Sequence, residues 1–489
     1  MKAVVFGPGR IGCGFAGQAL RASGHEVTFI APNPIMVEHL NRVQRYRVCL
    51  VQGRMRQEAM VEGFRAVLAD DADRVAGEIS EADLICTAVG GSCLQEIAPL
   101  IASGLLRRHS PVNVIAYENL ADAGATLRDL VASHLPPGFP LSRHGFSGAV
   151  VSRAVSHRLG DPSQDQPLTF LGDTPSAFVV DGQALREVHC PDPCSERNGH
   201  DPVFLKQVSD QIWRQYEGNL PHDHIRRLAS EVAAEFRDAK ITTFIPALVL
   251  KEAHERIRFK RPLRLMPAIE GMIISHDYPA WIARKLYIYN AGHAACAYLG
   301  YLKGYRYIHA AIRDPEIRAV VVGAMTEGQQ GVAASFGVQY GGDRRDLEDV
   351  LLRFENAALG DPISRVGREP LRKLRPDDRL VGAAHLAERA GIVPKNLALA
   401  IASALCFFDP SDSSAQSLQH ELATNGPNAV LRQTCRLEPK EGLGYHVLSE
   451  YRRLTREWLK VDPLLTLGVP VKTRTATRVS AFIASAGAP

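Results

Sequence analysis

The first part of the chain alternates short apolar runs with segments whose apolar residues recur at helical spacing. The apolar runs occupy residues 3–6, 25–30, 82–89 and 112–119. Helical spacing is found between them, at 12–23 and 93–106. Buried parallel strands joined by crossover helices produce this alternation. The pattern predicts a doubly wound sheet of the Rossmann type.

A different pattern follows this predicted sheet. Residues 187–262 begin with many turn-forming residues and continue as charged helix. Later segments show apolar positions at helical spacing, namely 279–304, 345–359, 381–391, 395–407, 413–425 and 445–460. We therefore expect a Rossmann-type α/β domain at 1–186, an insertion at 187–262 and a mostly helical domain at 263–489. The predicted fold class is α/β plus α.

The composition is that of a globular protein with more than one hydrophobic core. The 489 residues are 46% hydrophobic and carry a net charge of +4 from 57 basic and 53 acidic side chains. The basic residues form no long run interleaved with aromatic residues, so nucleic acid is not an expected partner. Small anions remain possible ligands.

Neither export nor membrane insertion is expected. The chain opens on a strand and a turn rather than on an export signal. Its most continuous apolar segment, 396–408, is shorter than the roughly 20 residues that a spanning helix needs. The nine cysteines are an odd number without a disulfide framework. We expect free thiols and a cytoplasmic location.

The insertion contains several residue types that could bind zinc. These are His189, Cys190, Cys194, His200, His222 and His224. Their spacing matches no standard zinc pattern, and prolines and a glycine lie among them. We interpret the segment as a polar loop and expect no metal.

A glycine loop follows the first predicted strand. In Gly7-P-Gly9-R-I-Gly12, the first glycine permits a tight turn and the second lets a pyrophosphate approach the backbone. The third allows the following helix to pack close to the strand, with its amino end facing the anion. We predict that Gly7, Gly9, Arg10, Ile11 and Gly12 bind a dinucleotide, with Arg10 able to contact a phosphate directly.

The end of the second strand leaves the choice of dinucleotide open. A carboxylate that accepts from the adenosine ribose is usual there, but this chain reads Ala31-Pro32-Asn33. Asn33 can still bind a ribose, and nothing repels a 2′-phosphate, so both NAD and NADP are possible. Small residues at Thr87, Ala88 and Val89 would pass beneath the nicotinamide-side ribose.

Three polar residues share one predicted helix, which spans 280–304. At about 100° per residue, Lys285, His293 and Asn290 fall near 0°, 80° and 140° around an α-helix. A lysine on a mostly apolar helix has a lowered pKa and can accept a proton at neutral pH. Taken singly, the three fit a snorkelling lysine, a core histidine and a polar helix contact. Together they favour a site.

Asn119 ends another predicted strand, where open α/β sheets bind their ligands. Its alternative role is to cap the helix predicted from residue 121.

Four segments give the chain a family resemblance. They are Gly7-PGRIGCG-Phe15, Tyr117-E-Asn119, Lys285-LYIYNAG-His293 and Arg365-VGREPLRK-Leu374. With them, the chain resembles the polyol-specific long-chain dehydrogenases over roughly 1–185 and 265–440. The resemblance implies a helical domain like that of 6-phosphogluconate dehydrogenase and a reaction that does not use zinc.

The same resemblance implies roles for individual residues. Lys285 would be the general base for alcohol oxidation and the general acid for ketone reduction. Asn119 and Asn290 would polarise the ketone, and His293 would orient substrate hydroxyls. This agrees with the chemistry, because hydride transfer creates alkoxide character that fixed amide donors stabilise. Arg365 and Lys373 match residues that hold the substrate in this family.

A basic string supports a phosphorylated substrate. Five cations lie within eleven residues, namely Arg365, Arg368, Arg372, Lys373 and Arg375. Arginine side chains suit phosphate geometry, and we favour Arg368 and Arg372 as phosphate ligands, with Arg375 on a solvated surface. The string is similar to that of family members that interconvert D-mannitol 1-phosphate and D-fructose 6-phosphate.

Other functions stay open. One is a dehydrogenase of an unphosphorylated sugar alcohol such as mannitol or arabinitol, another a catalytically silent nucleotide-binding homologue, and a third a hydroxy-acid dehydrogenase with a helical second domain. The chain also departs from the family at Ser152, where an aspartate is usual, in the missing acid after the second strand and in the insertion. The sequence does not predict the oligomeric state.

Overall fold

The computed structural model describes residues 1–53, 55–120, 122–175, 177–186 and 269–461, and structural statements below refer to these residues. The chain forms two compact units. The first comprises Met1–Val51 and Arg56–Tyr278, and the second comprises Gln52–Met55 and Pro279–Pro489. The predicted insertion at 187–262, with its possible zinc ligands, lies outside the described residues.

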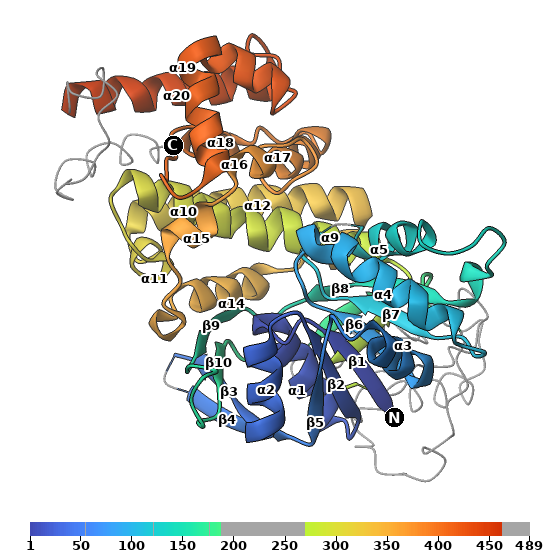
Figure 1. The fold of residues 1–489 in the computed structure, drawn as a ribbon. Coiled ribbons are helices and arrows are strands. Elements are labelled where there is room, and N and C mark those ends of the chain that lie inside the picture. The colour runs from blue at the N-terminus through green and yellow to red at the C-terminus, as the bar shows by residue number, and fades with distance from the viewer. Residues whose placement is uncertain (54, 121, 176, 187–268, 462–489) are drawn as a thin grey trace, which may run out of the picture. The chain divides into compact units, whose positions relative to one another are not determined.

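An eight-stranded sheet forms the centre of the first unit, in the order β12-β11-β8-β7-β6-β1-β2-β5 (Figure 1). The strands are β1 (Lys2–Phe6), β2 (Glu26–Ala31), β5 (Phe64–Leu68), β6 (Leu84–Thr87), β7 (Asn113–Ala116), β8 (Gly145–Val151), β11 (Phe178–Asp181) and β12 (Met272–Ser275). The pairs from β5 to β8 are parallel, which confirms the predicted Rossmann-type sheet. β11 runs antiparallel to β8, and β12 extends the sheet beside β11.

Helical layers cover both faces of this sheet. Because side chains alternate along a strand, Val4 and Phe6 of β1 face one layer while Ala3 and Val5 face the other. The first layer comprises α3 (Ala72–Glu81), α4 (Leu94–Leu106) and α5 (Ala123–Ala132). The second comprises η1 (Gly12–Gly17), α1 (Gln18–Ala22) and α2 (Pro34–Val43). The strands therefore read as continuous apolar runs, as the sequence indicated.

A smaller sheet packs on the second layer and was not predicted. Its strands, in the order β4-β3-β10-β9, are β3 (Arg45–Gln52), β4 (Met55–Glu62), β9 (Val155–Leu159) and β10 (Thr169–Gly172). β4 is mostly exposed and polar, so it lacks the apolar run that would identify a strand. The inner face of this sheet is aromatic, with the ring centroid of Tyr46 lying 5.5 Å from that of Phe170.

The helix after the glycine loop begins with the π-helical segment η1, which the sequence did not predict. Two side chains satisfy carbonyl groups within it. The Tyr46 hydroxyl donates to Cys13 O at 3.1 Å, and Arg153 Nη1 donates to Gly14 O at 3.1 Å. Arg153 Nη1 also donates to Gln18 Oε1 at 2.6 Å, and its guanidinium lies over the ring of Phe15. Burial lowers the pKa of Arg153 to about 10.

The second unit is helical, as predicted. Its longer helices are α10 (Ala291–Leu302), α12 (Pro315–Phe336), α14 (Arg344–Phe354), α17 (Val381–Arg389), α18 (Lys395–Leu405), α19 (Ser413–Gln433) and α20 (Gly442–Val461). α12 contacts α10, α17 and α18 and was not predicted as a separate helix. α19 is kinked at Gly426, where the backbone leaves helical geometry before Pro427. Among the described helices, none combines the length and hydropathy needed to cross a membrane.

Replacing Arg153 should destabilise the first unit. Arg153→Met leaves Gly14 O and a second acceptor, Pro175 O, without the buried donor that each now has. We expect the free energy of unfolding, measured by urea denaturation, to fall by about 2–3 kcal/mol. Arg128→Met, at an exposed position of α5, is the control and should change it by less than about 0.5 kcal/mol. Equal stability of the two variants would contradict a structural role for Arg153.

Candidate active site

The glycine loop has the geometry that a dinucleotide requires. Gly7 has a φ of +87°, and a Cβ there would lie 2.6 Å from Ala88 O. A Cβ at Gly12 would lie 1.9 Å from Gly7 O. The surrounding backbone therefore leaves no room for a side chain at Gly7 or Gly12, whether or not a cofactor is bound. A Cβ at Gly9 would meet nothing within 4 Å, so Gly9 faces open space where a pyrophosphate can approach the backbone.

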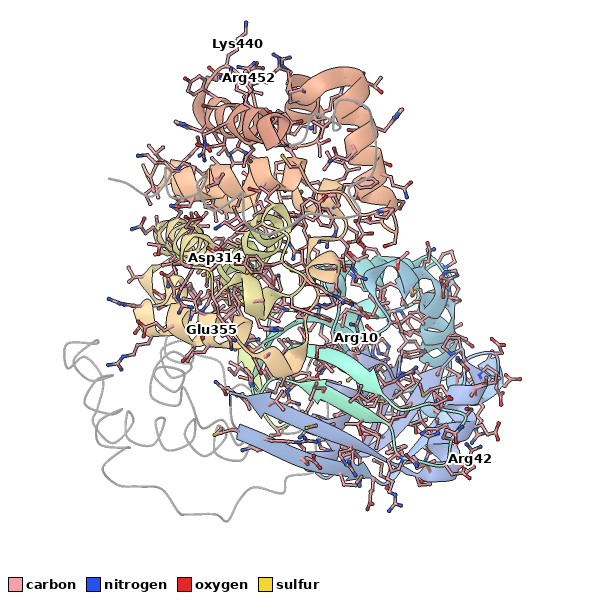
Figure 2. All side chains as sticks on the ribbon, turned by 90° about the vertical axis from the view of Figure 1, so that its left-hand side faces the viewer. Arg10, Arg42, Asp314, Glu355, Lys440 and Arg452 are labelled. Atoms are coloured by element: carbon pink, nitrogen blue, oxygen red, sulfur yellow. The ribbon has the colours of Figure 1, made fainter. Side chains whose placement is uncertain are left out.

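The two residues between Gly9 and Gly12 differ in environment. Arg10 is exposed, and its Nη1 donates to Ser156 O of β9 at 3.2 Å (Figure 2). Ile11 is half-buried and packs against the core under the loop. Direct contact of Arg10 with a cofactor phosphate stays a prediction.

Asn33 begins α2 as its N-cap. Its Oδ1 accepts from the backbone N–H groups of Ile35 at 2.9 Å and Met36 at 3.3 Å. The sequence analysis assigned Asn33 to the ribose and did not identify this cap. Because the amide oxygen is occupied, the Nδ2 hydrogens are the part of Asn33 that can reach a ribose hydroxyl.

The loop after β6 is held by a carboxylate that the sequence analysis did not identify. Glu118 accepts from Val89 N–H at 2.9 Å and from Gly90 N–H at 2.8 Å, and it is only 7% exposed. This contact fixes the backbone that follows Thr87 and Ala88. The sequence does contain a signal for this contact, because an acid follows one predicted strand and a Gly-Gly pair follows the strand before it.

Asn119 does not cap the helix that follows it. That helix, α5, begins at Ala123 with Asp122 at its N-cap position, and no side chain caps it. Asn119 is exposed, and its carboxamide makes no hydrogen bond with the residues that the structure describes. The carboxamide is therefore available to a ligand.

The helix of Lys285 is not the regular α-helix that the sequence predicted. α9 (Tyr278–Arg284) leads into the π-helical segment η4 (Lys285–Asn290), which continues as α10. The Ala291 N–H donates to Leu286 O, five residues back. In this geometry residue i+5 lies nearly above residue i, and π segments are frequent at functional sites.

Side chains five residues apart are therefore neighbours in η4. Arg284 Nε donates to the Tyr289 hydroxyl at 2.9 Å, and Arg284 also pairs with Asp346 at 2.9 Å. The same spacing separates Lys285 from Asn290, so we expect these two side chains to lie closer around the helix than the roughly 140° of an α-helix.

Glycines on neighbouring helices make room for this segment. A Cβ at Gly328 of α12 would lie 2.2 Å from Tyr287 O, and one at Gly292 would lie 2.5 Å from Cγ of Met325. The π segment directs the Tyr287 carbonyl toward α12, so α12 can approach only where it has no side chain.

Lys285 has the properties expected of a proton carrier. It is half-buried, and among the described residues no carboxylate lies within ion-pair distance of its amine. Burial lowers its pKa to about 8, and the charges of Arg379 and Arg353 contribute. The Asn290 carboxamide likewise has no hydrogen-bond partner within the described part of the chain.

His293 is oriented by a carboxylate that the sequence analysis did not identify. Its Nε2 lies 3.3 Å from Asp361 Oδ2, and its ring stacks on Phe354 with centroids 4.8 Å apart. Asp361 also accepts from Nε and Nη2 of Arg365, each at 2.6 Å. Burial lowers the pKa of His293 more than the Asp361 carboxylate raises it, and the neutral ring is favoured as a result. Asp361 lies four residues before Arg365, and that spacing was the signal.

The structure distinguishes the four predicted substrate-binding cations. Arg365 is paired with Asp361, and Arg372 is paired with Glu369 at 2.8 Å and Asp378 at 2.9 Å. Lys373 is 3% exposed, and its Nζ donates to Arg368 O. Burial lowers the pKa of Lys373 to about 7, with Arg379 and Arg372 contributing. The Arg368 side chain is exposed and has no ion-pair partner among the described residues.

The turn between Arg368 and Arg372 is strained. Glu369 has a φ of +58°, a conformation that costs a non-glycine residue about 1–3 kcal/mol. Its N–H donates to Asp412 Oδ2 at 2.7 Å, which helps to hold it there. Such strain is concentrated at functional sites.

Arg379 is a further residue that the sequence analysis did not identify. It is 8% exposed, and its charge contributes to the lowered pKa values of Lys285, His293 and Lys373. The basic string described in the sequence analysis stops at Arg375, and Arg379 follows four residues later.

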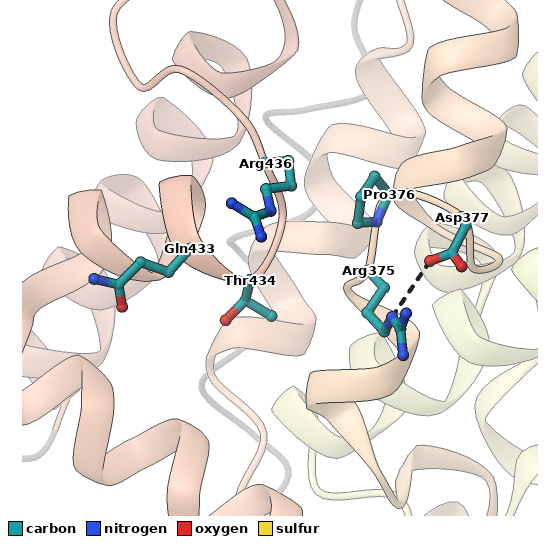
Figure 3. Close-up of a pocket in the computed structure, with 6 residues that line it drawn as sticks. All are labelled: Arg375, Pro376, Asp377, Gln433, Thr434 and Arg436. Carbon is teal, nitrogen blue, oxygen red and sulfur yellow. Dashed lines mark ion pairs between the residues drawn. The ribbon is translucent and has the colours of Figure 1, made fainter.

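The second unit also contains a pocket of about 470 Å³. Figure 3 shows the residues that line it. Its lining comprises Arg375, Pro376, Asp377, Gln433, Thr434 and Arg436. Arg375 is exposed and lies 3.4 Å from Asp377, as on a solvated surface. None of the predicted catalytic residues lines this cavity.

A Rossmann-type sheet with a glycine loop, in a chain that also carries a lysine of lowered pKa on a helical unit, defines a nucleotide-dependent dehydrogenase. The family model of the mannitol dehydrogenase Rossmann domain matches residues 1–188, and that of the mannitol dehydrogenase C-terminal domain matches residues 277–440. The chain belongs to the mannitol dehydrogenase family. It is an oxidoreductase of the polyol class, and NAD or NADP fits its Rossmann domain. These findings confirm the resemblance seen in the sequence.

Individual relatives agree with this assignment. The mannitol-1-phosphate 5-dehydrogenase of Brevibacillus brevis is 32% identical over 465 residues, which cover 94% of this chain and 99% of that protein. The structure of Pseudomonas fluorescens mannitol 2-dehydrogenase with NAD and D-mannitol is similar, with a TM-score of 0.63, 15% identity and coverage of 96% and 95% of the two chains. A substrate-free D-sorbitol dehydrogenase gives a TM-score of 0.62 at 14% identity, with 94% of each chain covered. The two structures support the fold.

Filling the space at Gly328 should destabilise the second unit. In Gly328→Ala the new methyl group collides with the Tyr287 carbonyl, and backbone must move to relieve the collision. We expect the free energy of unfolding in urea to fall by about 1–3 kcal/mol. Gly77→Ala in α3 is the control, because its Cβ meets nothing within 4 Å, and it should be neutral or stabilising by up to about 1 kcal/mol. A Gly328→Ala protein as stable as the wild type would show that α12 does not constrain η4.

Proposed function

We propose that the protein is an NAD(P)-dependent polyol-phosphate dehydrogenase that interconverts D-mannitol 1-phosphate and D-fructose 6-phosphate. One observation carries the catalytic part of the proposal. The Lys285 amine has a lowered pKa, has no described carboxylate partner and shares a π segment with an unpartnered carboxamide, that of Asn290. The relative named mannitol-1-phosphate 5-dehydrogenase supports the choice of substrate.

Residues of the first unit would hold the cofactor. Gly7 to Gly12 would accommodate the pyrophosphate, Asn33 the adenosine ribose, and Thr87 to Val89 the nicotinamide-side ribose. When bound, NAD(P) supplies the hydride acceptor for oxidation and the hydride donor for reduction. Asn33 carries no charge that would select against a 2′-phosphate, so the proposal includes both cofactors.

Residues of the chain would manage the proton and the developing charge. The neutral Lys285 amine takes the proton of the substrate hydroxyl during oxidation, and the ammonium returns it during reduction. Asn290 and Asn119 donate N–H groups to the substrate oxygen as it acquires negative charge. Because Asp361 holds the Nε2 side of His293, the Nδ1 atom is left to accept from a substrate hydroxyl.

The charge balance of the basic string supports a phosphorylated substrate. Cations exceed carboxylates around it by one: the cations are Arg365, Arg368, Arg372, Lys373 and Arg379, and the carboxylates are Asp361, Glu369, Asp378 and Asp412. Arg368 is the candidate with a side chain that no described carboxylate neutralises. A phosphate would balance the excess. The second candidate is a dehydrogenase of a free sugar alcohol, which the pairing of Arg365 and Arg372 with carboxylates favours.

We further infer a reducing compartment, in keeping with a cytoplasmic location. The cysteines at 13, 49, 86, 93, 296, 406 and 435 are free thiols, and all except Cys93 are buried. Burial would protect most of them from oxidation.

Removing the Lys285 amine should stop proton transfer. In Lys285→Met we expect kcat to fall by about 10²–10⁴-fold while the affinity for NADH, measured by fluorescence titration, changes by less than about twofold. Lys440→Met removes an exposed amine (Figure 2) and serves as the control, with wild-type kcat.

The wild-type pH profile tests the same residue. Oxidation needs the neutral amine, so its rate should rise with pH and level off above the Lys285 pKa of about 8. Reduction needs the ammonium and should decline above that pH.

Normal turnover by Lys285→Met would remove Lys285 from the mechanism.

The substrate is tested by comparing two ketoses. With NADH and with NADPH, we expect kcat/KM for fructose 6-phosphate to exceed that for fructose by at least about 100-fold, because charged hydrogen bonds to the phosphate each contribute about 1.5–3 kcal/mol. A higher kcat/KM for fructose would favour the free sugar alcohol instead.

A further inference from the structure

Arg379 is a buried guanidinium with a fixed orientation. It precedes α17 by two residues, and its side chain is 9% exposed. Its Nε donates to Asp378 Oδ1 at 2.7 Å, and its backbone N–H donates to the same oxygen at 2.6 Å. The backbone contact holds the Asp378 carboxylate in place, and the Nε contact then orients the guanidinium and its terminal nitrogens.

The terminal nitrogens have no protein partner. Among the described residues, neither Nη1 nor Nη2 of Arg379 makes a hydrogen bond or an ion pair. The carboxylate that Arg379 contacts, Asp378, is shared with Arg372, which pairs with its other oxygen at 2.9 Å. One carboxylate therefore serves two guanidinium groups. Nη1 and Nη2 are not enclosed by the protein, so an anionic ligand can reach both and accept from them.

The neighbours of Arg379 are the predicted site residues. Its charge acts on Lys285, His293 and Lys373, where it adds to the effect of burial on each pKa. The geometry agrees, because the Tyr287 hydroxyl of η4 donates to Asp377 O at 3.3 Å, α17 contacts η4, and Asp378 joins Arg379 to Arg372 of the basic string. The Lys373 amine, held by Arg368 O, is a second cation within reach of the same region.

We propose that Arg379 binds the phosphoryl group of the substrate through Nη1 and Nη2 and determines the preference for phosphorylated substrates. Two parallel N–H groups match two phosphate oxygens, a geometry that lysine cannot reproduce. Arg379 thus takes the place that the sequence analysis gave to Arg372, whose nitrogens already bind Glu369 and Asp378. This inference rests on the proposed function.

The test compares Arg379→Met and Arg379→Lys with the wild type, using fructose 6-phosphate and fructose. For Arg379→Met we expect kcat/KM for fructose 6-phosphate to fall by about 100-fold or more, because two charged hydrogen bonds are lost. The value for fructose, measured on the plateau of each variant's pH profile so that a shifted Lys285 pKa does not enter, should change by less than about threefold. Arg379→Lys keeps the charge but loses the paired donors, and its fall should be intermediate. Inorganic phosphate should compete with fructose 6-phosphate in the wild type and much less in Arg379→Met.

Arg375→Met is the matched control, because it removes an exposed guanidinium close in the sequence, and it should leave both kcat/KM values unchanged. If kcat/KM of Arg379→Met falls equally with both ketoses, or does not fall, the role of Arg379 is overturned while the proposed function stands. If Arg379→Met does not fold, as judged by circular dichroism, Arg379→Lys and phosphate competition decide the question. A wild-type enzyme without preference for fructose 6-phosphate would overturn the proposed function, and the phosphate role of Arg379 with it.

Discussion

The helix that carries Lys285 contains one residue more than α-helical hydrogen bonding can pair, and the geometry of the candidate site depends on how the fold accommodates that residue. The π segment aligns side chains five apart, as the contact between Arg284 and Tyr289 shows. It also directs the Tyr287 carbonyl outward, where Gly328 leaves the space for it. Helix packing, the position of Lys285 and the position of Asn290 are consequences of one backbone irregularity.

Carboxylates determine which basic groups of the site are committed to the protein and which are left for a ligand. Asp361 joins Arg365 to His293, and Asp378 joins Arg372 to Arg379. No described carboxylate pairs with Lys285, which is why burial and neighbouring positive charge can lower its pKa. The site is therefore positive but not uniformly so, and the unpaired groups are the ones suited to bind substrate.

The sequence predicted the parts of the molecule that depend on local periodicity. The central sheet follows from apolar runs such as that of β1, and the helical unit follows from apolar spacing such as that of α18. The small sheet was missed because β4 is polar and gains its place from pairing with β3 rather than from burial. The spacing of Lys285, Asn290 and His293 was enough to propose these three as site residues. Asp361, Arg379 and Glu118 could not be identified, because their roles arise from contacts between segments that a single chain pattern does not reveal.

The register of η4 has a consequence for comparing sequences of this family. Deleting one residue between Leu286 and Tyr289 would restore regular α-helical pairing and leave Lys285 and Asn290 four residues apart instead of five. The Tyr287 carbonyl would then form a regular helical hydrogen bond, and the space at Gly328 would have no group to accommodate. An alignment gap inside this segment therefore amounts to a different active-site geometry, even where every polar residue is retained.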